Sequence, residues 1–194
     1  MSLLLGAVLG YLLGSVPYGL LLTRAAGLGD IRAIGSGSIG ATNVLRTGNK
    51  KLAAATLVLD AAKGAAAMLI ARALWGEEAA LAAGLAAMAG HSFPIWLRFK
   101  GGKGVATAAG VLLVAAWWLA LAALAAWLAV FATTRISSAS ALSTCAVAPP
   151  LAFILGDPSL GLFCLGLAAL VILRHRPNIQ RLLAGTEPRF GTRK

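Results

Sequence analysis

The chain has 194 residues, of which 59% are hydrophobic and only 12% are charged, and its mean hydropathy is +0.85. Soluble domains carry about 25% charged residues, so this composition excludes an ordinary water-soluble globule and predicts a membrane protein. The net charge of +11 would suggest nucleic acid in a soluble protein, but the aromatic-plus-basic pattern of such a surface is missing. We therefore expect membrane lipids and phosphorylated small molecules as partners, and no nucleic acid.

Apolar stretches recur along the chain, and most approach the roughly 20 residues that a membrane span requires. They cover residues 3–23, 52–75, 79–97, 105–134, 139–156 and 159–173. The first lacks a basic start and a clear cleavage site, so we interpret it as a span rather than a signal peptide. Its Gly6, Gly10 and Gly14 predict close helix packing. Cys145 and Cys164 lack metal-ligand spacing and are interpreted as membrane-core residues.

The segments between these stretches differ in charge. Lys and Arg gather in the loops at 24–51 and 98–104 and in the tail at 174–194, whereas Glu77 and Glu78 follow the second stretch. Cytoplasmic segments are the ones enriched in Lys and Arg, so the two basic loops and the tail are all expected in the cytoplasm.

This placement constrains the number of crossings. The block 105–134 must cross twice, with Trp117 and Trp118 marking the turn between its halves, if the tail is to return to the cytoplasm. A single long tilted helix is the alternative. A further short cytoplasmic loop then falls at 135–138. The prediction is one all-α membrane domain over 1–194, with about seven transmembrane helices, the N-terminus outside and the C-terminus cytoplasmic.

The first cytoplasmic loop alternates glycine with small hydroxyl residues over residues 35–46. Glycine permits positive φ, so successive N–H groups can face one concavity and bind an anion. The candidate phosphate-binding residues here are Ser36, Gly37, Ser38, Thr42 and Asn43. Arg46 adds a planar fork suited to phosphate. A flexible polar linker is the alternative, but the flanking cations and the following helix favour an anion site.

The second basic loop, together with the residues that follow it (99–107), resembles a phosphate loop in its chemistry. Its glycines can expose backbone N–H groups, Lys103 supplies charge, and a helix N-terminus follows. The candidate binding residues beside Lys103 are Gly101, Gly102, Gly104 and Thr107. The spacing is not that of a Walker A motif. The alternative is a basic interfacial loop that only orients the protein in the membrane.

The tail begins with His175 and Asn178 among basic and apolar residues. Histidine titrates near neutral pH, so His175 is a candidate general base, and it is equally a candidate hydrogen-bond donor to phosphate. The alternative is an interfacial amphipathic helix that contains Arg176 and Arg181.

Two ionisable residues, Asp60 and Lys63, lie within the second stretch at a spacing that places them on one helix face. Charged groups at membrane depth usually pair or mark a site, so these residues either support the fold as a pair or contact substrate. His91 is interpreted as a cap or brace at the end of the third stretch, and Asp157 as a turn residue.

Together these segments resemble the bacterial acyl-phosphate-dependent glycerol-3-phosphate acyltransferase family. The likeness runs nearly end to end, through residues 14–19, 35–46, 59–64, 90–91, 99–107 and 175–183. Ser38 departs from the pattern, because the family's Gly-Ser-Gly run is usually followed by Asn. The resemblance implies an inner-membrane enzyme of phospholipid synthesis. It would move an acyl chain from acyl phosphate to the 1-hydroxyl of glycerol 3-phosphate, releasing lysophosphatidic acid and phosphate.

The chain shows no His-x4-Asp pair and no serine-nucleophile motif, so we expect catalysis by positioning and electrostatics. Arg46 and Lys103 would neutralise phosphate and stabilise the developing oxyanion. The loop donors Ser36, Ser38, Thr42 and Asn43 would fix a substrate headgroup. His175 and Asn178 would close the pocket. The base is either His175 or the substrate's own phosphate, whose second pKa is about 6.

No cofactor and no metal are expected, because no zinc-ligand set or nucleotide motif is present. The alternative function is a membrane transporter of organic phosphates. It would need polar groups through the membrane midplane, where the predicted spans are nearly bare apart from Asp60 and Lys63.

Overall fold

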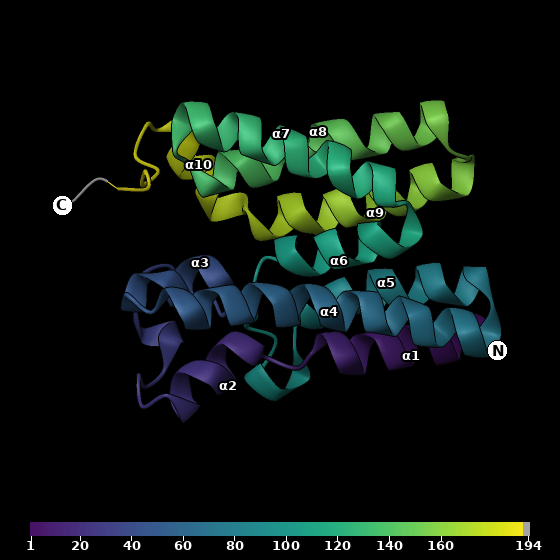
Figure 1. Cartoon of the computed structure of the whole chain (residues 1–194), viewed down its shortest axis with the longest axis horizontal. Helices are drawn as coiled ribbons and strands as arrows, with labels where there is room; N and C mark the ends of the chain where they lie inside the picture. The colour runs from purple at the N-terminus through teal and green to yellow at the C-terminus, as the bar shows by residue number, and fades with distance from the viewer. Residues whose placement is uncertain (192–194) are drawn as a thin grey trace. The chain divides into compact units, whose positions relative to one another are not determined.

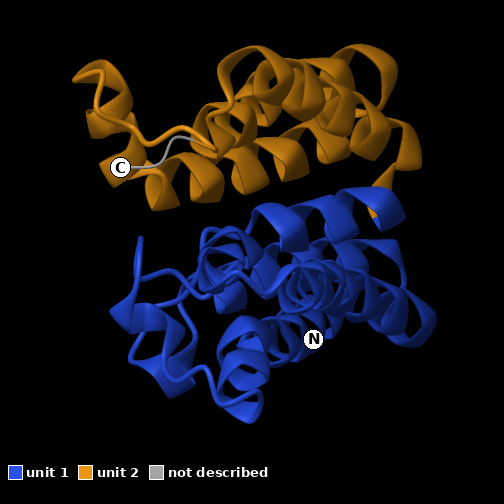
Figure 2. Cartoon of the chain, turned by 60° about the vertical axis from the view of Figure 1, so that its left-hand side comes forward, with its two compact units in different colours: residues 1–114 blue, residues 115–194 orange. Residues whose placement is uncertain are grey.

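The computed structural model describes residues 1–191, and over that range it contains helices and no strands. The all-α prediction is therefore confirmed for the described chain. Arg193 and Lys194 of the predicted basic tail lie outside the described residues. The chain divides into two compact units, Met1–Val114 and Ala115–Lys194 (Figure 2).

Several helices match the predicted spans. Within the described residues, five are long and apolar enough to cross a membrane: Ser2–Ala25, Lys50–Trp75, Glu77–Leu97, Trp117–Thr134 and Ser137–Leu155. The pair Pro158–Arg174 and Arg176–Leu183 raises this to six if the two helices, bent by 65° between them, count as one span. Val105–Ala115 is apolar but shorter.

Unit 1 contains three long helical segments and the two basic loops between and after them (Figure 1). Its elements are α1 (Ser2–Gly14), α2 (Tyr18–Ala25), η1 (Ile31–Ala33), α3 (Ala41–Val44), η2 (Leu45–Thr47), α4 (Lys50–Trp75), α5 (Glu77–Ser92), η3 (Ile95–Leu97) and α6 (Val105–Ala115).

Glycine sets the distance between α1 and α5. A Cβ atom built on any of the three α1 glycines would collide with the backbone of an alanine on α5, in the pairs Gly6–Ala79, Gly10–Ala83 and Gly14–Ala87. The backbones therefore approach as closely as a glycine stripe allows, and the predicted close packing is confirmed. Gly110 of α6 meets the Ala61 carbonyl of α4 in the same way.

The first predicted span is broken into α1 and α2. Pro17 precedes α2 as its N-cap residue, with φ −91° and ψ 71°, outside the helical region. Proline has no N–H to continue the hydrogen-bond ladder of α1, which ends at Gly14. Backbone carbonyls at the break are thereby released for other partners, and the Val16 carbonyl accepts from Lys63 Nζ at 2.8 Å.

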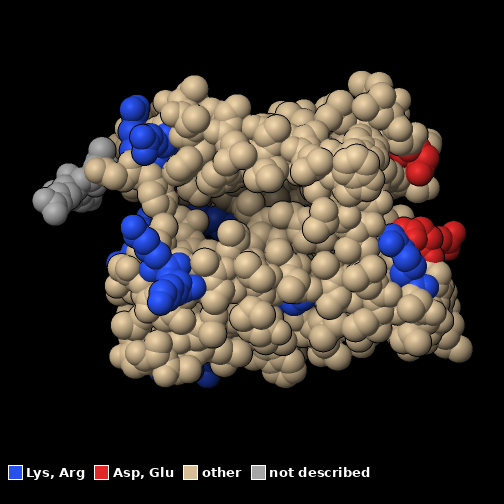
Figure 3. Space-filling model, viewed as in Figure 1, with Lys and Arg blue, Asp and Glu red and all other residues tan. Residues whose placement is uncertain are grey.

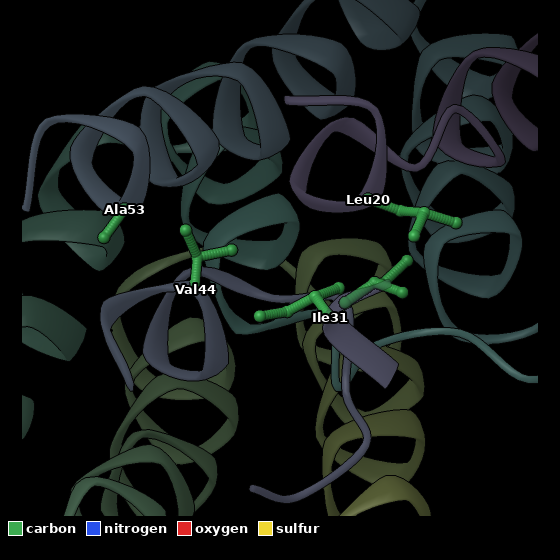
Figure 4. Packing of buried hydrophobic residues seen from close by; sticks show 5 residues of the cluster. Leu20, Ile31, Val44 and Ala53 are labelled. Atoms are coloured by element: carbon green, nitrogen blue, oxygen red, sulfur yellow. The ribbon is translucent and has the colours of Figure 1, made fainter. Parts of the chain in front are cut away.

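The loop between α2 and α4 is packed around a small core of its own. Leu20, Ile31, Ile39, Val44 and Ala53 are each at most 6% exposed and form one hydrophobic cluster (Figure 4). A segment anchored by its own core is not a flexible linker, so that alternative is wrong for this loop.

Unit 2 contains α7 (Trp117–Thr134), α8 (Ser137–Leu155), α9 (Pro158–Arg174) and α10 (Arg176–Leu183). The block predicted at 105–134 is two helices, because Ala116 is extended, with φ −159° and ψ 98°, and α7 begins at Trp117. The single-helix alternative is therefore wrong. Asp157, predicted to lie in a turn, caps α9 by accepting a hydrogen bond from the Leu160 amide at 2.9 Å.

Candidate active site

Asn43 organises the first basic loop. The two protons of its Nδ2 serve three carbonyl oxygens, those of Ile31 at 2.9 Å, Ile34 at 3.1 Å and Ser38 at 2.8 Å, so one proton is shared between two acceptors. Its Oδ1 accepts from the Ser36 amide at 3.1 Å, and the residue is only 1% exposed. Both polar atoms of the predicted phosphate ligand are therefore engaged within the loop, which they hold in one conformation.

The outer face of the same loop carries the exposed donors. Gly35 and Gly37 adopt φ of 57° and 67°, a region that side-chain-bearing residues rarely enter. A Cβ on Gly35 would collide with the Arg46 guanidinium, so Arg46 folds back over the loop. Ser36 and Thr42 are exposed beside it. Ser38 is half-buried, and its Oγ accepts from the Gly40 amide at 3.3 Å.

Ion pairs fix the start of this loop. The Asp30 carboxylate lies 2.5 Å from Arg32 and 2.8 Å from Arg24. The hydrogen bond from the Arg32 guanidinium is the main cause that holds the pKa of Asp30 well below its usual range. The Asp30 carboxylate therefore remains ionised throughout the physiological pH range.

The second basic loop, residues 99–104, is fastened to the end of α5. The Gly101 amide donates to the Ser92 carbonyl at 3.3 Å, and the Gly102 amide donates to the His91 carbonyl at 3.0 Å. We expected these amides to face a phosphate, but in this structure they bind the loop to α5. Glycine at position 102 instead lets the loop backbone approach the His91 ring, because a Cβ on Gly102 would overlap Nε2 of His91.

Lys103 and Thr107 differ in exposure, although both were predicted to bind phosphate. Lys103 is half-buried just before α6, whereas Thr107 is fully buried against Gly64 of α4. Thr107 Oγ1 and Ser92 Oγ are buried oxygen atoms that have no hydrogen-bond partner within the described chain. Gly104, between them in sequence, has φ 79° and would bring a Cβ against Met88.

A charged cluster lies buried beneath the 99–104 loop. Lys63 Nζ lies 2.7 Å from Asp60 Oδ1, and both side chains are 2% exposed. The same nitrogen lies 2.8 Å from the Val16 carbonyl oxygen and 3.0 Å from His91 Nδ1. The structural pairing of Asp60 and Lys63 is therefore confirmed.

The sequence interpretation missed His91 as a member of this cluster. His91 is 3% exposed and was interpreted only as a cap or brace. Asp60 and Lys63 were singled out because an ionisable residue at membrane depth usually has a partner. The same rule applies to a histidine in an apolar segment. Applied to His91, it would have indicated a third member of the buried charged cluster.

Unit 2 contains the two predicted tail residues. His175 is 2% exposed, and its Nδ1 lies 2.8 Å from the Val171 carbonyl oxygen. A carbonyl only accepts, so Nδ1 carries the proton and Nε2 of the neutral ring is an acceptor. Asn178, one turn further on, donates from Nδ2 to Glu187 Oε1 at 2.6 Å.

Glu187 is a second residue that the sequence interpretation missed. Besides Asn178 it accepts from Ser138 Oγ and from Arg181 Nε, each at 2.7 Å. Burial alone would raise the pKa of Glu187, but the hydrogen bonds from Ser138, Asn178 and Arg181 more than offset it and lower the pKa. Glu187 thereby ties the segment after α10 to the start of α8.

Charge is also distributed unevenly along unit 1. Lys and Arg gather over the end that contains α2, α3 and the start of α4 (Figure 3). Glu77 and Glu78 lie beyond the other end of α4, where Arg72 pairs with Glu77 at 2.6 Å. Lys and Arg are therefore concentrated at one end of the unit, which is the asymmetry that the positive-inside rule uses to predict a cytoplasmic side.

A family model described as glycerol-3-phosphate acyltransferase matches residues 4–185. A curated glycerol-3-phosphate acyltransferase from Jannaschia sp. (strain CCS1) is 58% identical over 192 residues, covering 98% of this chain and 95% of the relative. Another, from Agrobacterium fabrum (strain C58 / ATCC 33970), is 59% identical over 189 residues, covering 97% of this chain and 92% of the relative.

Solved structures agree with these relatives. The crystal structure of PlsY, an integral membrane glycerol 3-phosphate acyltransferase, in its glycerol 3-phosphate form is similar with a TM-score of 0.92 and 39% identity, covering 99% of this chain and 97% of that one. Its lysophosphatidic acid form gives a TM-score of 0.90 and 38% identity over the same shares. The resemblance inferred from the motifs is confirmed, and the chain belongs to the glycerol-3-phosphate acyltransferase family.

Proposed function

We propose that this chain transfers a fatty acyl group from an acyl phosphate to the 1-hydroxyl of sn-glycerol 3-phosphate, giving lysophosphatidic acid and phosphate. The observation that carries the proposal is the near full-length likeness to PlsY in both its glycerol 3-phosphate and its lysophosphatidic acid forms. Those two molecules are a substrate and the product of the proposed reaction.

The residues of unit 1 suit the handling of phosphate. Arg46, exposed over the first loop, and Lys103, half-buried before α6, would neutralise phosphate charge and stabilise the oxyanion that develops at the acyl carbon. Ser36, Ser38 and Thr42 would fix a headgroup with hydroxyl donors. In this proposal Asn43 acts through the loop it holds together rather than by contacting substrate.

Two groups remain candidates for the base that accepts the proton of the glycerol hydroxyl. His175 has a tautomer that suits the role, because its Nδ1–H is held by the Val171 carbonyl and Nε2 is then the basic nitrogen of the neutral ring. The alternative is the phosphate of a substrate, whose second pKa is about 6. Asn178, bonded to Glu187, would support the backbone around His175.

Turnover by His175→Ala, measured against pH at saturating substrate, separates the two bases. A loss of several orders of magnitude with substrate binding intact would contradict the substrate-as-base proposal. Retention of turnover within about tenfold, with a pH profile that still follows the phosphate, would support it.

The finer membrane placement also belongs to this proposal. Seven crossings follow if α6 and α7 each cross and α9 is a span, with the N-terminus outside and the C-terminus in the cytoplasm. The basic ends of the loops would then face the cytoplasm of a bacterium from its inner membrane, where glycerol 3-phosphate is dissolved. The acyl chain would remain among the lipids.

Purified protein in detergent, given acyl phosphate and glycerol 3-phosphate, tests the function. We expect phosphate release that requires glycerol 3-phosphate and equals the lysophosphatidic acid formed. Arg46→Gln should lose about tenfold to hundredfold in kcat/KM, the value of a hydrogen bond to a charged group. Lys50→Gln, which removes a charge from the exposed start of α4, is the control. Absence of release with both substrates present would favour transport of organic phosphates instead.

A further inference from the structure

We propose that Lys63 fixes His91 in the tautomer whose proton is on Nε2, and that His91 in this form positions the 99–104 loop. Lys63 and His91 would thus be positioning residues for the reaction proposed above. The tautomer itself follows from the buried cluster alone. The effect on catalysis rests on the proposed function.

The hydrogen-bond count at Lys63 carries the argument. An ammonium group has three protons and no acceptor. Lys63 Nζ has three neighbours at bonding distance: the Val16 carbonyl oxygen at 2.8 Å, Asp60 Oδ1 at 2.7 Å and His91 Nδ1 at 3.0 Å. A carbonyl and a carboxylate only accept, so each takes one proton. The third proton lies between Lys63 and His91.

That proton belongs to the lysine. In water an amine of this type has a pKa of about 10.4 and an imidazole one of about 6.5, so the amine is far the stronger base. The Tyr18 ring, whose centroid is 5.7 Å from Lys63 Nζ, adds attraction for a cation at this position. Asp60 supplies the one negative charge that balances it.

A doubly protonated His91 fits the same geometry poorly. It would place two cations 3.0 Å apart, between Lys63 Nζ and His91 Nδ1, with one carboxylate to balance them. The hydrogen bond from its Nδ1 to Asp60 Oδ1 would span 3.5 Å, which is longer than ordinary N–H···O hydrogen bonds. His91 is therefore neutral, with Nδ1 as the acceptor from Lys63 and the proton on Nε2.

Nε2 of His91 lies against the 99–104 loop. A Cβ added to Gly102 would overlap this nitrogen, and the Gly102 amide donates to the His91 carbonyl at 3.0 Å. The ring and the backbone of His91 therefore both contact the residue just before Lys103. A chain of contacts runs from Asp60 through Lys63 and His91 to the loop.

Loss of Lys63 should release the ring and shift Lys103. A displacement of about 1 Å in a catalytic group can lower the rate by about a hundredfold. We expect Lys63→Met to lower kcat and to raise KM for glycerol 3-phosphate, whereas Lys50→Met on the exposed start of α4 should change neither.

Nitrogen NMR of the protein labelled with ¹⁵N-histidine tests the tautomer without any assay of activity. The sequence has only two histidines, and His175→Gln assigns their signals. We expect His91 to show an unprotonated Nδ1 and a protonated Nε2, and His175 to show the opposite pattern. In Lys63→Met the Nδ1 of His91 faces the Asp60 carboxylate without the ammonium, so Nδ1 should become protonated. A protonated Nδ1 on His91 in the wild type, alone or with a protonated Nε2, would overturn the proposal.

Lys63→Met removes the ammonium that balances the buried Asp60 and leaves only the longer approach of His91 Nδ1 at 3.5 Å, so the variant is at risk of misfolding. The double variant Asp60→Asn/Lys63→Met removes both charges and serves as the folded comparison, checked by its melting temperature. A changed His91 pattern with unchanged kcat and KM in this variant would overturn the positioning role. A wild-type protein that shows the expected tautomers but makes no lysophosphatidic acid would sink only the proposed function.

Discussion

At the scale of single residues, two asparagines of the first basic loop differ in which side-chain atoms are used. Asn43 shares its two Nδ2 protons among three carbonyl oxygens and also accepts through Oδ1. Asn49 uses its Oδ1 to accept from the Leu52 amide at 3.1 Å and thereby caps α4. An aspartate at either position keeps the acceptor and loses the donor.

This difference yields a matched prediction. Asn43→Asp should leave buried carbonyls unpaired, at about 1–3 kcal/mol each, and should turn a carboxylate toward them. We expect a lower melting temperature and a large rise in KM for glycerol 3-phosphate. Asn49→Asp should retain the cap and change neither quantity by much, because Asp and Asn cap helices about equally. Equal behaviour of the two variants in both measurements would contradict the assigned role of Asn43.

Residue types and local spacing predicted part of the candidate site. The glycine and hydroxyl pattern around Ser36 predicted an anion-binding loop with Arg46 beside it; the loop is ordered, and its binding of an anion stays a prediction. That Asn43 is turned inward depends on carbonyls of Ile31 and Ile34, up to 12 residues away. His91 meets Lys63 across 28 residues and between two helices, a contact that no local pattern contains.

At the scale of elements, the α1–α5 contact depends on the absence of side chains on α1. Gly10→Val should force the helices apart, because the new side chain meets the Ala83 backbone. Overpacking of this kind costs about 1–3 kcal/mol. Val8→Ile, which adds a methylene on the exposed face of α1, is the control. The melting temperature in detergent should fall for the first variant only, and an equal fall in both would contradict the packing argument.

The segment after α10 gives a prediction about pH. The pKa of Glu187 is lowered in the folded chain, so its stabilising effect is present above the unfolded pKa of about 4.3 and is lost as pH falls through the lowered value. Hydrogen exchange at the Phe190 amide, which donates to the Arg135 carbonyl at 2.8 Å, reports this attachment. Protection should fall at acid pH in the wild type. In Glu187→Gln it should be low throughout and lack that transition.

At the scale of the whole molecule, hydropathy located the apolar segments but not how each one ends. The span predicted at 3–23 is two helices because Pro17 interrupts the ladder, and the segment at 79–97 ends as a helix at Ser92. The division of 105–134 was found from the charges of distant segments, since no residue within it forbids one helix. That argument needed the tail on the cytoplasmic side.

The same argument makes orientation testable. A fluorescent protein that matures only in the cytoplasm, fused after residue 194, should be bright in cells. The same reporter fused after residue 156, between α8 and α9, should be dark, because that loop is expected outside. A dark C-terminal fusion with full-length protein present would contradict the seven-span proposal and the cytoplasmic tail together.

The break at Pro17 has a consequence for any attempt to redesign the first span. An uninterrupted helix would draw the Val16 carbonyl back into its own ladder, and the Lys63 ammonium would lose one of its three acceptors. Straightening this apolar segment would therefore leave a buried cation on a different helix with one hydrogen bond unmade. A simplified version with a continuous first helix would have to replace Lys63, Asp60 and His91 at the same time. Pro17 and the buried ions would therefore have to be changed together.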